Sequence, residues 1–451
     1  MAKDRFLQDK AFLKKLLTLT LPIALQSLLL ASVAASDAFM LGRIEQNAMA
    51  AVSLATQIQF VQNMIVSSAV AAEAVLGAQY WGSGDKEKIK GVFFTTLKLS
   101  GLTSLLFFLA CILSPTLLMH IFTSDPVLVD IGVHYLRLAG WSYLLTGISQ
   151  CYLALFKVTE KPQTATLIST VAVLLNIVLN AFFIFGFLFI PALGAEGAAI
   201  ATLISRVVEL LLALGLTYGK GVVRPEMKKL FHFDKELFQS FYRCALPLIG
   251  AYLVWGVGFT SYSAFMGHLG ADAAAANSVA SVIRDLVCCL CSGAASGAGI
   301  LVGNELGAGR LERGRLYGDR IVKISFLIGI FSTLVMLLLV PVSLSFVKLT
   351  GEARTLLVGM MAIMAFYMIG RSVNGIVING IFASGGDTLF DMYSLTVAMW
   401  CIAVPLAALG TFVFHWPVLV VYACTCLDEV GKIPWTMLHY RKYKWVKNLT
   451  K

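Results

Sequence analysis

The chain has 451 residues, of which 58% are hydrophobic and 13% are charged, and its mean hydropathy is +0.82. A soluble globular domain carries about 25% charged residues and under ~50% apolar ones, so this composition excludes a soluble protein. The net charge of +10 does not indicate nucleic-acid binding, because the basic residues lie in short loops between apolar runs and are not interleaved with exposed aromatic residues.

Apolar runs of roughly 20 residues or more predict an all-α integral membrane protein with twelve transmembrane helices. The run at 16–42 is much longer than the apolar core of a signal peptide, so it is predicted to be the first span. The other expected spans are 48–77, 91–122, 127–157, 163–190, 195–218, 241–267, 273–304, 318–347, 354–383, 389–413 and 416–437.

Lysine and arginine are unevenly distributed between the two sides of these spans. They are frequent in the N-terminal segment, in the loops at 86–90, 157–161, 220–235 and 310–320, and after residue 440. Loops on the opposite side carry little beyond Arg43, Lys348 and Arg354. Basic residues favour the cytoplasmic side, so both termini are predicted to be cytoplasmic and the chain to be multi-pass in the plasma (inner) membrane.

The two halves of the chain resemble each other at an offset of about 225 residues, which predicts a duplicated transporter. The predicted parts are a six-helix lobe at 1–218, a cytoplasmic loop at 219–242 and a second six-helix lobe at 243–451. In the loop, Phe231, Phe233, Leu237 and Phe238 predict an amphipathic surface helix. The matching segments are Leu21-Pro22 with Leu246-Pro247, Met40-Leu41-Gly42 with Phe265-Met266-Gly267, and the segment 77–82 with 303–308.

Asp37 is the sharpest candidate for a functional residue. It is the only charged residue between Leu16 and Leu41, and it lies about eight residues beyond the middle of its span, roughly 12 Å toward the outer side. Its counterpart in the repeat is Tyr262, so the acid belongs to the first half alone. The carboxylate can bind a proton or, with neighbouring oxygens, a hard cation. Alternatively, it caps the helix or reaches the membrane surface.

Other polar residues within the spans allow two interpretations each. Asn176 and Asn180 lie four residues apart on one helix face, where their amides can bind a cation or connect two helices. Arg206 with Glu209, and Arg284 with Asp285, are predicted to be structural ion pairs.

Three further residues in the spans bear on bending and on packing. Tyr252 and Trp255 are typical of packing or of a drug-binding wall. Pro22 frees a backbone carbonyl and is the predicted hinge of the first helix.

An ordered set of motifs on these spans resembles the multidrug and toxic compound extrusion family over nearly the whole chain. The motifs are Leu21-Pro22 followed by Asp37 and Met40-Leu41-Gly42, the segments 78–82, 176–186 and 194–202, and Gly385-Gly386-Asp387-Thr388. The resemblance implies two six-helix lobes related by a pseudo-two-fold axis around a central cavity. It also implies export of cationic or amphipathic organic compounds by alternating access, in exchange for entering protons or sodium ions.

The resemblance also implies which residues form the sites. Asp37 matches the family's coupling aspartate, and Asn176, Asn180 and Thr202 match the polar residues that complete its cation site. Some relatives have an acid where this chain has Asn180, and others have one in the seventh helix, so coupling is predicted to rest on Asp37. The residues expected to line the substrate cavity are Gln26, Met40, Tyr252, Trp255, Tyr262 and Arg284.

The expected partners are small organic cations and membrane lipid, and we expect the chain to act as a monomer. No cofactor beyond the coupling ion and no bound metal is expected, since the nine cysteines lie in apolar runs without metal-ligand spacing.

Two other functions compete with export. A flippase for a lipid or a lipid-linked sugar has the same architecture, and Arg206, Arg284 and Arg371 are the cations that can hold its phosphate. A membrane-embedded enzyme needs clustered acids or histidines, whereas the six histidines are scattered and there is no Gly-Lys-Ser/Thr motif for ATP. The sequence therefore predicts a transporter rather than an enzyme.

Overall fold

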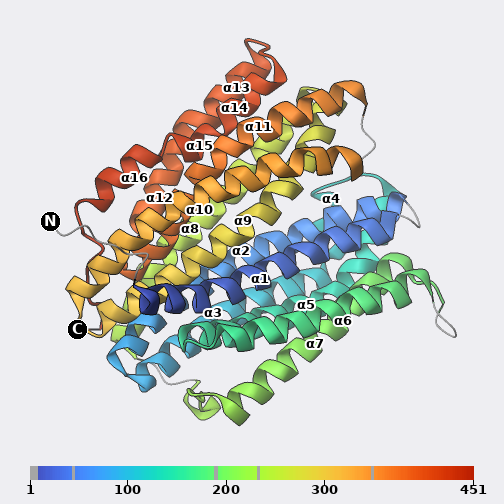
Figure 1. Cartoon of the computed structure of the whole chain (residues 1–451). Coiled ribbons are helices and arrows are strands. Elements are labelled where there is room, and N and C mark those ends of the chain that lie inside the picture. Colours follow the sequence, from blue (N-terminus) through green and yellow to red (C-terminus); the bar gives the residue numbers. More distant parts are fainter. Residues whose placement is uncertain (1–8, 43–45, 187–190, 231–233, 347–349, 451) are drawn as a thin grey trace. The chain divides into compact units, whose positions relative to one another are not determined.

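The computed structural model describes residues 9–450 except 43–45, 187–190, 231–233 and 347–349, and it leaves out the side chains of 34, 35, 37–39, 42, 46, 220 and 346. The described residues are almost entirely helical and contain no β-strand (Figure 1). A helix satisfies its backbone hydrogen bonds internally, as a segment in lipid requires. The predicted all-α membrane fold is confirmed.

The helices follow the predicted spans in chain order. The first half contains α1 (Lys10–Gly42), α2 (Gln46–Ser83), α3 (Lys86–Leu113), the short α4 (Pro115–His120), α5 (Pro126–Val158), α6 (Pro162–Phe185) and α7 (Gly194–Lys220). The second half begins with α8 (Lys235–His268), α9 (Ala271–Gly307), α10 (Leu311–Phe346) and α11 (Gly351–Asn374). It continues with the π-helix η3 (Gly375–Phe382), α12 (Leu389–Leu395), the π-helix η4 (Thr396–Ala403), α13 (Val404–Phe412), α14 (Val418–Thr425), α15 (Leu427–Val430) and α16 (Ile433–Tyr440).

Ten helices in the described part of the chain are long and apolar enough to cross a membrane. The other two predicted spans correspond to α5 and to the run from α14 to α16. These two differ from the others: α5 contains Asp130, His134 and Arg137, and the last run is divided into three short helices of 8, 4 and 8 residues.

The chain between α7 and α8 differs from the prediction. After the short 3₁₀ helix η2 (Met227–Lys229), α8 already begins at Lys235, so Leu237 and Phe238 lie in its first turn and not in a separate surface helix. Phe231 and Phe233 are outside the described residues. Asp234 starts α8 by accepting hydrogen bonds from the backbone N–H groups of Glu236 and Leu237, both at 3.1 Å. A hydrogen bond from Lys88 Nζ (2.8 Å) and the bond from Leu237 lower the pKa of Asp234.

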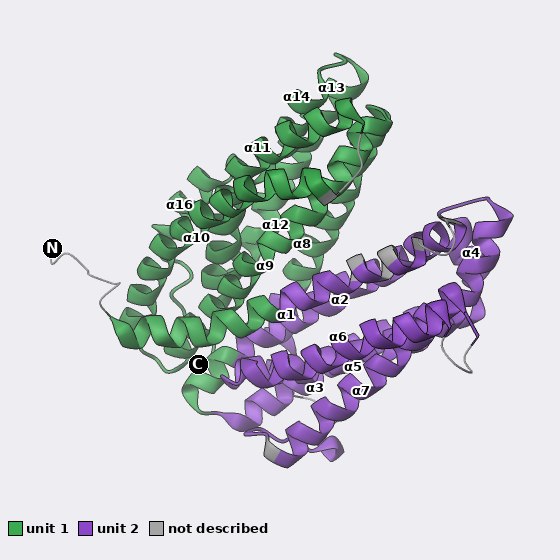
Figure 2. Cartoon of the chain, turned by 45° about the vertical axis from the view of Figure 1, so that its right-hand side comes forward, with its two compact units in different colours: residues 1–25, 78–84, 246–451 green, residues 26–77, 85–245 purple. Residues whose placement is uncertain are grey.

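The chain forms two compact units that are discontinuous in sequence (Figure 2). The C-terminal unit comprises residues 1–25, 78–84 and 246–451, and the N-terminal unit comprises residues 26–77 and 85–245. The start of α1 belongs to the C-terminal unit because it packs on α9, where Gly293 and Gly297 lie against Ala24 and Thr20. The lobe boundaries expected from the sequence remain a prediction.

Two repeated motifs meet inside the C-terminal unit. A Cβ atom on Gly82 would collide with the backbone of Asn304, and one on Gly307 would collide with the backbone of Gln79. At the offset of 225 residues, which pairs these segments one residue earlier than 77–82 with 303–308, position 79 corresponds to 304 and position 82 to 307. The contact of Gly82 with Asn304 and that of Gly307 with Gln79 are therefore the same contact made by each half. Reciprocal contacts of this kind define a local two-fold relation. The glycines in the repeated motif are therefore packing residues.

The Gly385-Gly386-Asp387-Thr388 motif receives the last residues of the chain. Trp445 is fully buried, and a Cβ atom on Gly385 would collide with its backbone carbonyl. His439 Nε2 lies 2.7 Å from Asp387 Oδ2. Gln79 Nε2 donates to the carbonyls of Ser384 (2.6 Å) and Lys447 (3.1 Å). The motif thus anchors the C-terminal segment to the ends of the helices in this unit.

Candidate functional site

A cavity of about 450 Å³ lies within the N-terminal unit. Cavities that hold small organic ligands usually measure about 300–1,000 Å³, so this one is large enough for such a ligand. The described residues that line it come from α1, α2, α5, α6 and α7. Its polar lining residues are Ser53, Thr56, Gln59, Asn63, Ser67, Tyr135, Thr146, Gln150, Asn176, Thr202, Ser205 and Arg206.

The structure brings together three of the predicted cation-site residues. Asn180 Nδ2 donates to Asn176 Oδ1 at 3.2 Å, and Asn176 Nδ2 donates to Thr202 Oγ1 at 3.3 Å. Asn176 and Asn180 are buried, and Asn176 and Thr202 line the cavity. The spacing of four residues along α6 places both amides on one face, as expected. The amides therefore connect α6 to α7 and also present oxygen atoms close to the cavity.

A glycine in α7 allows this arrangement. A Cβ atom on Gly197 would collide with the backbone carbonyl of Phe183 near the end of α6. Only a residue without a side chain permits such close packing of the two helices, which places Thr202 within reach of Asn176. Gly197 belongs to the 194–202 segment that carries the family resemblance, and its role here is to fix the helix pair.

The remaining N-terminal candidates lie in α1. Asp37 is within this helix, but its side chain is outside the described residues. Gln26 is buried, and its Nε2 donates to Ser169 Oγ on α6 at 2.7 Å. Met40 is partly buried and packs against the apolar cluster that contains Leu41. Pro22 lies inside α1, as predicted.

Arg206 is the only charged residue among the described residues that line this cavity. Its Nη1 lies 2.8 Å from Glu209 Oε2, so the predicted ion pair is confirmed. Glu209 is fully buried, and the same carboxylate oxygen accepts a hydrogen bond from Ser149 Oγ at 3.0 Å. A buried pair of this kind holds both side chains in place, and it neutralises the positive charge at the cavity wall.

Helix α2 also contributes to this cavity, which was not predicted from the sequence. Gln59, Asn63 and Ser67 line it, and they are spaced four residues apart along α2. This spacing is typical of one face of a helix, so the polar stripe was visible in the sequence.

The C-terminal unit contains smaller cavities. Tyr252 and Trp255 line one of about 160 Å³, together with Arg371, Asp391, Asn374, Glu429 and Lys432. Tyr262 and Arg284 line another of about 30 Å³, together with Asp428. The second predicted ion pair is confirmed, since Arg284 Nη2 lies 2.8 Å from Asp285 Oδ1. The structure therefore groups four of the predicted cavity residues in this unit and the others in the N-terminal unit.

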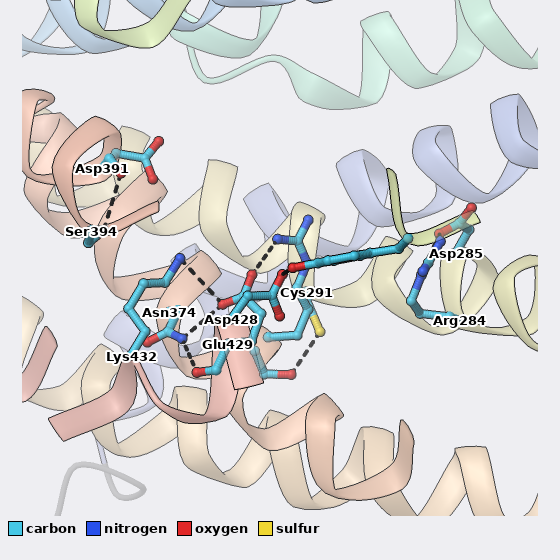
Figure 3. A network of polar contacts seen from close by, with 12 residues as sticks. Arg284, Asp285, Cys291, Asn374, Asp391, Ser394, Asp428, Glu429 and Lys432 are labelled. Atoms are coloured by element: carbon cyan, nitrogen blue, oxygen red, sulfur yellow. Dashed lines mark hydrogen bonds and ion pairs between the residues drawn. The ribbon is translucent and has the colours of Figure 1, made fainter. Parts of the chain in front are cut away.

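A cluster of charged residues that sequence analysis did not predict lies at these C-terminal cavities (Figure 3). Glu429 is buried and accepts from Arg371 Nη1 (2.8 Å) and Asn374 Nδ2 (2.8 Å), with Lys432 Nζ at 3.6 Å. Asp428 precedes it in the chain, and Asp391 faces the larger cavity. Two adjacent acids, followed by a lysine one helical turn later in a predicted span, were the signal for this cluster.

A sequence model of the MatE family matches residues 22–182 and 247–409, which together are more than half of the chain. The chain belongs to the MatE family. The two matched segments begin at the same offset as the internal repeat. This MatE protein is a multi-pass membrane transporter, as the sequence predicted.

Named relatives of this MatE protein span most of its length. It is 25% identical to the uncharacterized transporter YisQ of Bacillus subtilis over 89% of this chain and 88% of that protein. It is 26% identical to the probable multidrug resistance protein NorM of Pasteurella multocida, over 87% of this chain and 85% of that protein. It is 23% identical to the multidrug resistance protein MdtK of Yersinia enterocolitica, over 87% and 86%.

Solved structures show the same fold. The Vibrio cholerae MATE transporter VcmN matches this MatE protein with a TM-score of 0.88 at 17% identity, over 97% of this chain and 98% of that one. An outward-facing multidrug resistance MATE family transporter of the MOP superfamily matches with a TM-score of 0.87 at 17% identity, over 96% and 95%.

Proposed function

We propose that this protein is a cation-coupled antiporter that exports cationic or amphipathic organic compounds by alternating access. Protons or sodium ions entering the cell drive the export, and the coupling site comprises Asp37, Asn176, Asn180 and Thr202. We place the protein in the plasma membrane as a monomer with both termini in the cytoplasm. Relatives that carry the name multidrug resistance protein support the substrate class.

The observation that carries this proposal is the hydrogen-bonded row Asn180–Asn176–Thr202 beside the 450 Å³ cavity. Val33 and Leu41 of α1 also line that cavity. Position 37 lies four residues from each of them, so helical spacing predicts that it shares their face. A carboxylate, two amides and a hydroxyl together supply the oxygen ligands that a hard cation prefers.

Coupling needs a conformational change that the cation and the substrate bias in opposite directions. In our proposal, cation binding neutralises Asp37, which favours bending of α1 at Pro22 and release of the substrate to the outside. The two ligands are coupled only if they bind the two conformations with different free energies. Pro22 suits this role because it removes one hydrogen bond of the helix.

The cavity favours an organic cation over a phosphate-bearing lipid. A flippase needs cationic side chains that are free to hold a phosphate group. Arg206 is already bound to Glu209 at 2.8 Å, and the other described lining residues are neutral. An anionic headgroup therefore gains little there, whereas the negative charge of Asp37 suits a cation.

The proposal predicts gradient-driven export by the purified protein. Proteoliposomes loaded with a fluorescent cationic dye are given an inward proton gradient or an inward sodium gradient, separately. We expect one of the two gradients to accelerate dye efflux above its rate without a gradient, and that gradient identifies the coupling ion. Folded protein that releases dye equally fast with and without either gradient would contradict the proposal.

A further inference from the structure

Tyr262 on α8 stands where the repeat would place a second coupling acid. This tyrosine is the counterpart of Asp37 at the offset of 225 residues, so the C-terminal unit has no acid at that position. In the structure, Tyr262 Oη donates to Asp428 Oδ2 at 3.3 Å. A carboxyl group therefore does lie beside this tyrosine in the C-terminal unit, but it belongs to Asp428 on α15.

The carboxyl group of Asp428 is buried and incompletely hydrogen-bonded. Asp428 is only 4% exposed. In the described part of the chain, no donor lies within hydrogen-bond distance of its Oδ1 atom. Removing an ionised carboxylate from water without partners costs several kcal/mol, on the order of the cost of a charge inside a membrane. Glu429, by contrast, has Arg371, Asn374 and Lys432 around it.

The charges around Asp428 do not balance when every group is ionised. Arg284 is paired with Asp285, and Glu429 lies between Arg371 and Lys432. Asp391 and Asp428 add two further carboxylates, so four acids face three bases in this region. One additional positive charge makes the group neutral. The titratable and charged residues around Asp428 are Tyr262 on α8, Arg284, Asp285 and Cys288 on α9, Tyr367 and Arg371 on α11, Asp391 on α12, and Tyr422, Cys426, Glu429 and Lys432 near α15.

We propose that Asp428 is a proton-binding site of the C-terminal unit, separate from the coupling site that we assign to the N-terminal unit. The proton resides on the carboxyl group of Asp428, which lines the 30 Å³ cavity; Tyr262 donates to Oδ2, and Oδ1 has no donor among the described residues. Protonation removes the excess negative charge of the cluster, and deprotonation restores it. The π-helix η3 begins at Gly375, directly after Asn374, and π-helical turns within α-helices are frequent at functional sites.

The size of the cavity and the positive charge of Arg284 favour a proton over a metal ion. A volume of about 30 Å³ holds roughly one or two water molecules, which suffice to deliver a proton. A sodium ion needs several oxygen ligands, as other hard cations do. The cavity wall contains such oxygen atoms in Ser263, Asn277, Ser281 and Thr425, beside aromatic and sulfur-containing side chains, so the type of ligand does not distinguish the two ions. Arg284 lines the same cavity and repels a metal cation.

Infrared spectroscopy of the purified full-length protein tests this proposal, because it detects proton binding independently of transport. At neutral pH, we expect the C=O stretching band of protonated carboxyl groups in the parent to contain a component from Asp428 that Asp428→Asn lacks. The buried Glu73 contributes equally to both spectra, so the difference between them reports Asp428. Asp130→Asn is the matched control, because Asp130 is 79% exposed and lies in the N-terminal unit, outside this charge cluster, and it should retain the band. A band that persists unchanged in folded Asp428→Asn would overturn the assignment, as would its absence from the parent.

Tyr262→Phe keeps the proposal testable if Asp428→Asn does not fold. This variant retains the acid and loses one hydrogen bond to its ionised form. We expect the band to persist. As the pH is lowered, it should appear at a higher pH than in the parent, and appearance at the same pH as in the parent would contradict the assignment. Sodium chloride in place of potassium chloride should leave the band unaltered. A band that sodium abolishes would identify a metal cation as the occupant.

Discussion

Asp37→Asn is expected to abolish ion-driven efflux and to leave an intact, membrane-inserted protein. The amide keeps the size of the carboxyl group but carries no charge, so it cannot exchange a proton and holds a cation weakly. Dye efflux from proteoliposomes under the effective ion gradient should fall to the rate seen without a gradient. Because Asp37 is the only charged residue between Leu16 and Leu41, no neighbour on that part of α1 can replace it.

The control for this variant is Asp130→Asn. Asp130 lies in α5 with 79% of its side chain exposed, and its nearest ionic partner, His134, is 3.9 Å away. The same chemical change there should leave ion-driven efflux at the parent rate. Full coupled efflux by Asp37→Asn would show that the coupling site lies elsewhere, with Asp428 as the next residue to examine.

Breaking the Arg371–Glu429 pair is expected to be the most destabilising change in the C-terminal unit. Removing one partner of a buried ion pair costs about 3–5 kcal/mol, because the other charge stays buried without compensation. Arg371→Met should therefore lower the free energy of unfolding by about that amount, reduced by the contact that Lys432 keeps with Glu429 at 3.6 Å. Chemical unfolding in detergent, followed by intrinsic fluorescence, measures the change.

A double variant separates loss of charge balance from loss of packing. Arg371→Met combined with Glu429→Leu removes both charges, so it should be less destabilised than the sum of the two single variants. Lys229→Met is the control for an exposed pair, since Lys229 and Glu87 are 46% and 64% exposed, and it should cost about 0–1 kcal/mol. Additive single and double effects would show that Arg371 and Glu429 do not depend on each other.

Most of the fold could be predicted because lipid imposes a simple pattern on the sequence. Every predicted span corresponds to a helix or to a run of helices. The ends agree where charged residues, prolines or glycines delimit an apolar run, as at Pro162 and Gly194. The prediction was wrong between α7 and α8, where aromatic spacing indicated a separate surface helix. Leu237 and Phe238 instead continue into α8, whose start Asp234 sets by a cap that hydropathy does not report.

The candidate sites divide according to whether their residues share a helix. Asn176 and Asn180 were predicted together because one α6 face carries both, and family resemblance added Thr202 from the next helix. The pairing of Glu429 with Arg371 joins residues 58 positions apart, and Tyr262 reaches Asp428 across 166 positions. Periodicity within one helix does not reveal such contacts. The sequence shows Asp428, Glu429 and Lys432 as neighbours in one span, but their partners on other helices became visible only in the fold.

The central claim is that substrate and ion move in opposite directions through one coupled cycle. The most direct measurement reverses the driving force: dye-loaded proteoliposomes receive no ion gradient, and an internal indicator follows protons or sodium ions as the dye leaves. We predict that outward dye flow draws the coupling ion inward in the parent, and that Asp37→Asn shows no such ion movement. Dye efflux without ion entry in the parent would contradict antiport.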